Sequence, residues 1–133
     1  MKALRDLVIA DATINALVEG RVYVNEIPKA VIEAADTFHP QKMLVLRQAG
    51  GTAKQDYLPI DQPLVTALCY GESDFEAERV RRAVWTRFNG LSREIVSDVL
   101  IHHINPTGGA IPLREPDIVW PATAQSYSIM AEA

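Results

Sequence analysis

The chain has 133 residues, of which 48% are apolar and 23% charged, and its formal net charge is −4. This length fits one domain, residues 1–133, and the apolar content is enough for a hydrophobic core, which excludes a globally disordered chain. Cys69 is the single cysteine, so an intramolecular disulfide is impossible and a cysteine-based zinc site is nearly so.

The N-terminal segment is predicted to be helical. Its apolar residues recur at helical spacing in two groups, Leu4, Leu7 and Val8, then Ile14, Leu17 and Val18. Asp11 lies between the groups and is a good N-cap, so we expect either one helix with a break there or two short helices. Gly20 is placed to end the helical segment, and residues 21–24 are expected to be extended.

The middle of the chain predicts two main strands. Residues 42–47 form the first, which Gly50 and Gly51 end before a loop at residues 52–55. A short helix at residues 28–35 precedes it, and a short edge strand at residues 57–60 follows it. In the second main strand, residues 64–70, alternate side chains face opposite ways: Leu64, Thr66, Leu68 and Tyr70 on one face, and Val65, Ala67 and Cys69 on the other.

The clearest helix begins after Ser73. Ser73 and Glu76 have the spacing of a capping box, and Asn89 with Gly90 ends the helix after about 16 residues. An apolar stripe follows one side of it, made of Ala77, Val80, Val84 and Phe88. Glu78 and Arg82 form an i,i+4 pair of the favourable orientation on its polar surface.

Two strands close the chain, at residues 95–105 and 118–131. A turn at residues 106–109 and an extended loop at residues 110–116 connect them. In the first strand we expect Val99, Ile101 and His103 on one face, and Leu100, His102 and Ile104 on the other. In the second strand Tyr127 and Ile129 are expected to face away from Ser126 and Ser128.

The order of elements predicts an α+β fold, an antiparallel sheet of about four strands with helices packed on one face. No apolar stretch approaches the roughly 20 residues that span a bilayer. Asp6 and Asp11 interrupt the N-terminal segment where a signal peptide would be apolar. We therefore expect neither a membrane segment nor an export signal.

The residues that could carry chemistry have simpler explanations. His102 and His103 are adjacent on a strand, so their side chains point to opposite faces and cannot jointly bind one ion. Cys69 lies mid-strand in an apolar context, as a small buried hydrophobe does. The glycine pairs lack phosphate-loop spacing and are expected to be turn glycines. We expect no catalytic residue, no cofactor and no metal; a small enzyme using Cys69 or His103 is the alternative.

The charged residues do not predict a nucleic-acid-binding surface. Arg79, Arg81, Arg82 and Arg87 are interleaved with Glu76 and Glu78 and lack an aromatic platform for stacked bases. A solvated helix face, or one that contacts a protein neighbour, is favoured. Trp85 is expected either at the core margin or at an interface. The net charge of −4 suits a surface that DNA passes without sticking.

Several segments, taken in order, resemble the tail completion (tail terminator) protein family of long-tailed phages, which has relatives in phage-like gene-transfer particles. They are residues 20–23, 43–51, 56–61 and 68–71, Glu76 with Ala77, residues 114–117, and Trp120 with Pro121. The resemblance covers nearly the whole chain, and it rests on the order and spacing of motifs that are individually weak. Residues 25–41 depart from it, since the family's Pro-containing link is usually shorter.

The resemblance implies a structural virion protein, assembled in the host cytoplasm. Such proteins form a ring, commonly of six copies, at the head-proximal end of the tail tube. They end tube growth and join the tail to the head connector, while leaving a channel for DNA. The implied partners are further copies of the chain, the tail tube protein and the head–tail stopper or connector protein. A head–tail stopper or adaptor protein of the neck is the second reading.

A closed ring of this kind needs two unlike contact patches on each subunit. Loops with small residues can become ordered on docking, and the helix arginines can face a neighbour. The candidate interface residues are therefore Gly50, Gly51, Thr52, Lys54, Gln55, Arg79, Arg82, Thr107, Gly108 and Arg114.

Overall fold

The computed structural model describes residues 2–25, 42–52, 60–113 and 121–132. Their elements are α1 (Lys2–Ala10), α2 (Ala12–Val18), β1 (Val22–Val24), β2 (Met43–Thr52), β3 (Ile60–Tyr70), α4 (Asp74–Asn89), β4 (Glu94–Val96), β5 (Val99–Leu113) and β6 (Ala122–Glu132). The helix predicted at residues 28–35 lies outside the described residues, as do residues 57–59 of the predicted edge strand. No helix in the described ranges is long and apolar enough to cross a bilayer.

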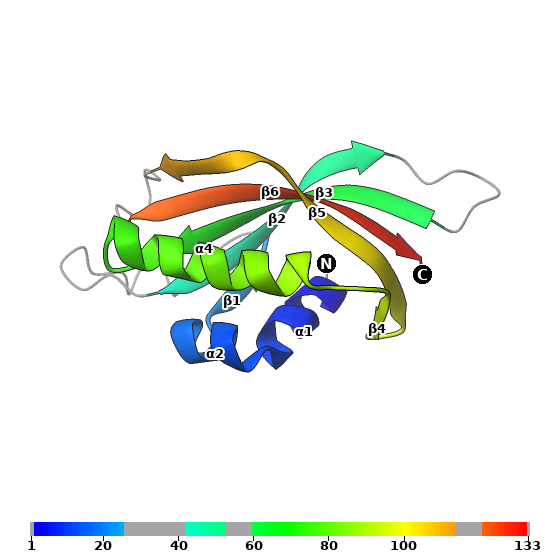
Figure 1. Cartoon of the computed structure of the whole chain (residues 1–133), viewed down its shortest axis with the longest axis horizontal. Coiled ribbons are helices and arrows are strands. Elements are labelled where there is room, and N and C mark those ends of the chain that lie inside the picture. Colours follow the sequence, from blue (N-terminus) through cyan, green and yellow to red (C-terminus); the bar gives the residue numbers. More distant parts are fainter. Residues whose placement is uncertain (1, 26–41, 53–59, 114–120, 133) are drawn as a thin grey trace.

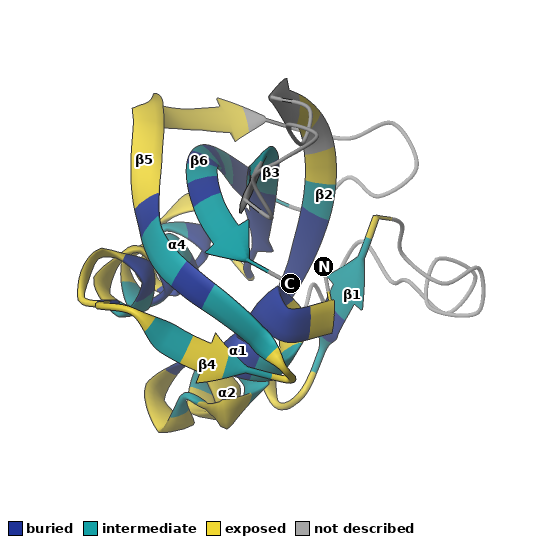
Figure 2. Cartoon of the chain, turned by 90° about the vertical axis from the view of Figure 1, so that its right-hand side faces the viewer, coloured by how far each residue is buried: buried dark blue, intermediate teal, exposed yellow. Residues whose placement is uncertain are grey.

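The strands form one six-stranded sheet in the order β1-β2-β3-β6-β5-β4. β1 runs parallel to β2, and the other neighbouring pairs are antiparallel. The prediction of about four antiparallel strands is only roughly matched, because the short strands β1 and β4 extend the sheet at its two edges. The sheet is curled (Figure 2), and the described helices α1, α2 and α4 lie together on one side of it (Figure 1).

The side chains of β3 divide between two hydrophobic clusters, as predicted. Val65, Ala67 and Cys69 belong to the main core, which the helices cover. Leu68 and Tyr70 belong to a smaller cluster on the opposite face of the sheet. This division follows from the two-residue repeat of a strand, which sends successive side chains to opposite faces.

The single strand predicted at residues 95–105 is wrong. Ser97 and Asp98 adopt left-handed backbone angles, with φ of 49° and 65°, and reverse the chain between β4 and β5. Val96 then pairs with Val99 across this two-residue turn. Polar residues that tolerate positive φ favour such hairpin turns, so the break has a local chemical cause.

The predicted alternation in β5 is also wrong. Ile101 pairs with Ala131 of β6, but His103 pairs with Met130, so His102 is an extra residue at a bulge. A bulge resets the two-residue repeat. As a result Ile101 and Ile104, predicted on opposite faces, are both buried in the main core.

Two glycine-containing segments predicted as turns lie inside strands. β2 continues through Gly50 to Thr52, and β5 continues from residue 106 to Leu113. The strand register shifts between Gln48 and Gly51 and again between Thr107 and Ile111. Gly50 and Gly108 have φ of 94° and 78°, which glycine adopts without a steric penalty. These glycines therefore form bulges. Residues 110–113 of the predicted loop belong to β5, and residues 114–116 lie outside the described residues.

For the described helices, the predictions are confirmed at the N-caps of α2 and α4 and on the buried faces. The Asp11 side chain accepts a hydrogen bond from the Ile14 amide at 3.0 Å and begins α2, so the N-terminal segment is two short helices. Ser73 accepts from the Glu76 amide at 3.3 Å and begins α4. The stripe Ala77, Val80, Val84 and Phe88 is fully buried or nearly so.

Candidate functional site

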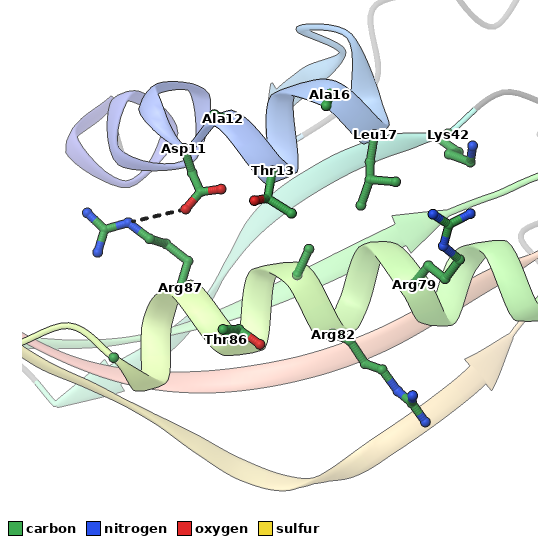
Figure 3. A pocket seen from close by; sticks show the side chains of 12 residues that line it. Asp11, Ala12, Thr13, Ala16, Leu17, Lys42, Arg79, Arg82, Thr86 and Arg87 are labelled. Atoms are coloured by element: carbon green, nitrogen blue, oxygen red, sulfur yellow. Dashed lines mark ion pairs between the residues drawn. The ribbon is translucent and has the colours of Figure 1, made fainter.

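An open groove of about 1150 Å³ lies between α2 and α4 (Figure 3). Small or short side chains line its middle: Ala12, Thr13, Ala16, Leu17, Ala83 and Thr86. Charged side chains lie at its rims: Asp11, Lys42, Arg79, Arg82 and Arg87. The groove exists because the facing turns of both helices carry short side chains, which leave the space between them unfilled.

One end of the groove is held by Arg87. Its side chain lies 3.8 Å from the Asp11 carboxylate (Figure 3) and donates to both carboxylate oxygens of Glu94 at 2.9 Å. The same Asp11 caps α2, so this ion-pair group links the start of α2, the end of α4 and strand β4. The cation near the last turn of α4 also interacts favourably with the helix dipole.

The other end of the groove is held by Glu76. Its carboxylate lies 3.3 Å from the Lys42 ammonium and accepts a hydrogen bond from Arg79 at 3.1 Å. Desolvation acts to raise the pKa of Glu76, but the hydrogen bonds from Arg79 and Lys42 outweigh it and lower that pKa below its ordinary value. Glu76 is therefore held as an anion between two cations, and it does not close the capping box back onto Ser73 in the described contacts.

Arg82 behaves differently from the other groove cations. Its side chain points away from α2 (Figure 3), is 75% exposed, and pairs with Glu78 at 3.3 Å, as predicted. Glu78 also pairs with Arg81, whose hydrogen bonds are the main reason that the pKa of Glu78 is lowered. The outer surface of α4 thus presents Arg82 to the solvent at the edge of the groove.

The groove has the chemistry of a protein contact. Each of Lys42, Arg79, Arg82 and Arg87 is already paired with a described carboxylate, so their charge is largely balanced within the chain. Across the described part of the chain, no group of three or more His, Cys, Asp or Glu side chains is placed to hold a metal ion. What the groove offers is a concave surface of small apolar side chains between mixed-charge rims.

The geometry does not bring Cys69 and His103 together. Cys69 pairs with Thr123 of β6, whereas His103 pairs with Met130, about 23 Å farther along the same strand. Cys69 is fully buried, and desolvation raises the pKa of its thiol to about 12, which disfavours the reactive thiolate. His102 lies 3.3 Å from the Glu132 carboxylate, and His103 lies 3.1 Å from the Asn105 amide.

The predicted interface residues that the structure describes lie in three separate places. Gly50, Gly51 and Thr52 lie at the end of β2, and Thr107 with Gly108 lies in the outer half of β5. The C-terminal ends of β2 and β5 point toward opposite ends of the molecule (Figure 1). Arg79 and Arg82 lie on α4, on the helical side of the sheet. Lys54, Gln55 and Arg114 lie outside the described residues, as does Trp120.

Sequence reasoning missed both the groove and one exposed aromatic residue. The groove depends on Ala12, Ala16 and Ala83, whose spacing on separate helices becomes meaningful only when the helices are packed together. Phe75 is 85% exposed at the start of α4. The signal was present in the sequence, because Phe75 lies outside the stripe that begins at Ala77.

The similarity of this chain to known proteins lies in its fold. No protein-family model matches the chain, and no curated protein matches it. A chain from a solved structure, described as the virion of a native gene transfer agent particle, has a similar fold with a TM-score of 0.72 and 15% sequence identity. The similarity covers 99% of this chain and 93% of that chain. At this identity it shows that the two chains share a fold.

Proposed function

We propose that this protein is a structural component of a phage or phage-like particle. The observation that carries the proposal is the fold shared over 99% of the chain with a chain of a gene transfer agent virion. The segments that resemble tail completion proteins, found in the sequence alone, support the same class of function. Two independent kinds of likeness, one in sequence motifs and one in three-dimensional fold, thus favour a particle protein.

Within the particle, the proposed role is a ring at the head-proximal end of the tail tube. The ring, of six copies, ends tube growth and presents the surface that the head–tail stopper or connector protein binds. DNA passes through its channel, and the protein is assembled in the host cytoplasm before it becomes part of the virion. The partners are other copies of the chain, the tail tube protein and the connector.

The chemistry of the described surface supports a structural role. The rims of the α2–α4 groove are ion pairs that leave little unbalanced charge, which suits contact with protein. The cations of α4 are paired with Glu76, Glu78 and Glu94, so they are poorly placed to grip a phosphate backbone. Cys69 and His103 lie far apart along the sheet, which argues against a nucleophile–base pair.

Deletion of the gene, followed by electron microscopy of the products, tests this role. The expected result is tails of uncontrolled length that do not join heads, with both defects reversed when the protein is supplied. Antibody labelling at the head-proximal end of head-less tails is expected as well. Normal tail length together with label only on filled heads would instead favour a stopper or adaptor, and substrate turnover by the purified chain would favour an enzyme.

A further inference from the structure

Phe75 is an exposed apolar projection with acidic neighbours. It lies in the first turn of α4 and is 85% exposed, the highest value among the large apolar side chains that are exposed. Glu72 and Asp74, which precede it in the chain, are exposed too, and Glu72 lies 4.0 Å from the Lys42 ammonium. A fully solvated phenylalanine contributes nothing to the core, whereas aromatic anchors commonly dominate protein interfaces.

A small apolar pocket of about 300 Å³ lies where α1 crosses the sheet. Its apolar lining comes mainly from the start of α1 and from β5 and β6, with one residue of β3: Ala3, Leu4, Pro63, Val99, Ile101, Ile129 and Ala131. Lys2 is the charged residue of the lining, and Gln48 is a polar residue at its edge. Lys2 is exposed, and it has no ion-pair partner among the described residues. The pocket therefore presents an apolar floor with one exposed cation beside it.

The projection and the pocket lie toward opposite ends of the subunit. The first turn of α4 is at one end of the long axis, and the start of α1 lies in the other half, beside β4 (Figure 1). Two complementary patches on opposite ends of one chain are the requirement for head-to-tail contacts, which close into a ring when the rotation between copies allows it.

From this complementarity, we propose that Phe75 of one copy seats in the α1–β5–β6 pocket of the next copy. The occupant is a second copy because the acidic residues that precede Phe75 match the exposed ammonium of Lys2 at the pocket, so apolar and charged groups meet their counterparts together. The inference deepens the proposed ring function and rests on it for the number of copies. It adds the contact that joins one subunit to the next.

Disulfide trapping tests the contact directly. In the full chain, Glu72→Cys with Gln48→Cys places one thiol beside Phe75 and one at the pocket, and leaves Phe75, Asp74 and Lys2 in place. The native Cys69 is fully buried and does not compete. Oxidation of the purified chain at high concentration, and of particles that contain it, is expected to give a ladder of covalent multimers. Addition of Phe75→Ser to the same pair is expected to remove at least about nine-tenths of the ladder.

A matched pair controls for random collision. Ile111 is 63% exposed in β5, so Ile111→Cys with Gln48→Cys offers equally accessible thiols away from the first turn of α4. This pair is expected to give few multimers. Sedimentation of the single variants complements the trapping: Phe75→Ser is expected to weaken self-association about thirty-fold, and Ile111→Ser by less than about three-fold. Since both side chains are exposed, neither change is expected to prevent folding.

Charge exchange supplies a second, independent readout. Lys2→Glu alone and Glu72→Lys alone are each expected to weaken self-association, and the double variant is expected to restore most of it.

The outcomes separate the contact from the ring function. If particles contain rings but Phe75→Ser does not reduce the amount of covalent multimer, this contact is wrong and the ring function stands. A Phe75-dependent ladder in a chain that is absent from tail necks would support the contact and contradict the function. A chain that stays monomeric in solution, with no ladder in particles, would overturn both.

Discussion

The ring of Phe88 in α4 meets the ring of Tyr127 in β6 edge-on, with centroids 4.9 Å apart and ring planes at 89°. Both side chains are buried, so this contact holds the last turn of α4 against the centre of the sheet. Edge-to-face pairs of this kind add stabilisation beyond the area that they bury. Because α4 forms one wall of the α2–α4 groove, the same contact also fixes the shape of that groove.

Phe88→Ala is expected to destabilise the fold by about 3–5 kcal/mol, because it leaves a cavity beneath α4. Tyr127→Phe keeps the ring and removes a buried hydroxyl that has no hydrogen-bond partner among the described residues. That variant is expected to be as stable as the parent or about 1 kcal/mol more stable. Urea denaturation followed by circular dichroism measures both changes. A large loss of stability in Tyr127→Phe would mean that the hydroxyl has a partner.

Gly71 precedes α4 and has no room for a side chain. A Cβ atom there would lie 2.3 Å from the backbone nitrogen of Ala77 and 2.7 Å from the carbonyl carbon of Glu76. Gly71→Ala is therefore expected to cost about 3 kcal/mol, since backbone must move to admit the methyl group. Gly109→Ala is the matched control, because nothing lies within 4 Å of its Cβ position. Equal unfolding midpoints for the two variants would contradict this packing.

The stability of the fold is expected to decline in alkali partly through Cys69. Burial raises the pKa of its thiol from 9.0 to about 12. Between these values the unfolded chain has released the thiol proton and the folded chain retains it, so rising pH favours unfolding. The contribution is complete below about pH 9 and is lost as the pH approaches 12. Cys69→Ala is expected to lose less stability than the parent between pH 8 and pH 11, as measured by chemical denaturation.

Arg82 offers a test of contact that is separate from folding. Its side chain is 75% exposed and its pairing with Glu78 is at the surface, so Arg82→Glu is expected to change stability by no more than about 1 kcal/mol. If α4 faces a neighbour in the particle, the same change is expected to reduce incorporation into tails several-fold. Arg82→Lys keeps the charge and is the control. Normal incorporation of Arg82→Glu would place this face toward solvent.

Much of the helical part of the fold follows from local sequence. The Ser73 cap and the stripe from Ala77 to Phe88 correctly predict α4, because capping and a 3.6-residue repeat are encoded within a few turns. Asp11 likewise separates α1 from α2. The alternation of side chains between the two faces of β3 is also predicted correctly. Both faces are packed, and the pairing of β3 with Met43–Gln48 of β2 is regular.

The strand ends and the site depend on pairing that local sequence does not encode. A glycine at positive φ suits a turn and a bulge equally, so Gly50 and Gly108 do not reveal that β2 and β5 continue. The bulge at His102 moves Ile104 to the core because β6 lies opposite it. The α2–α4 groove and the α1–β5–β6 pocket each join residues that are far apart in the chain, and only the packed structure shows them together.

A reconstruction of the assembled particle by electron cryomicroscopy tests the central claim most directly. The expected result is a ring of six copies of this fold between the last ring of the tail tube and the head connector, with DNA passing through its centre. Density for this chain elsewhere in the particle, or particles that lack it while their tails are complete and joined to heads, would contradict the account.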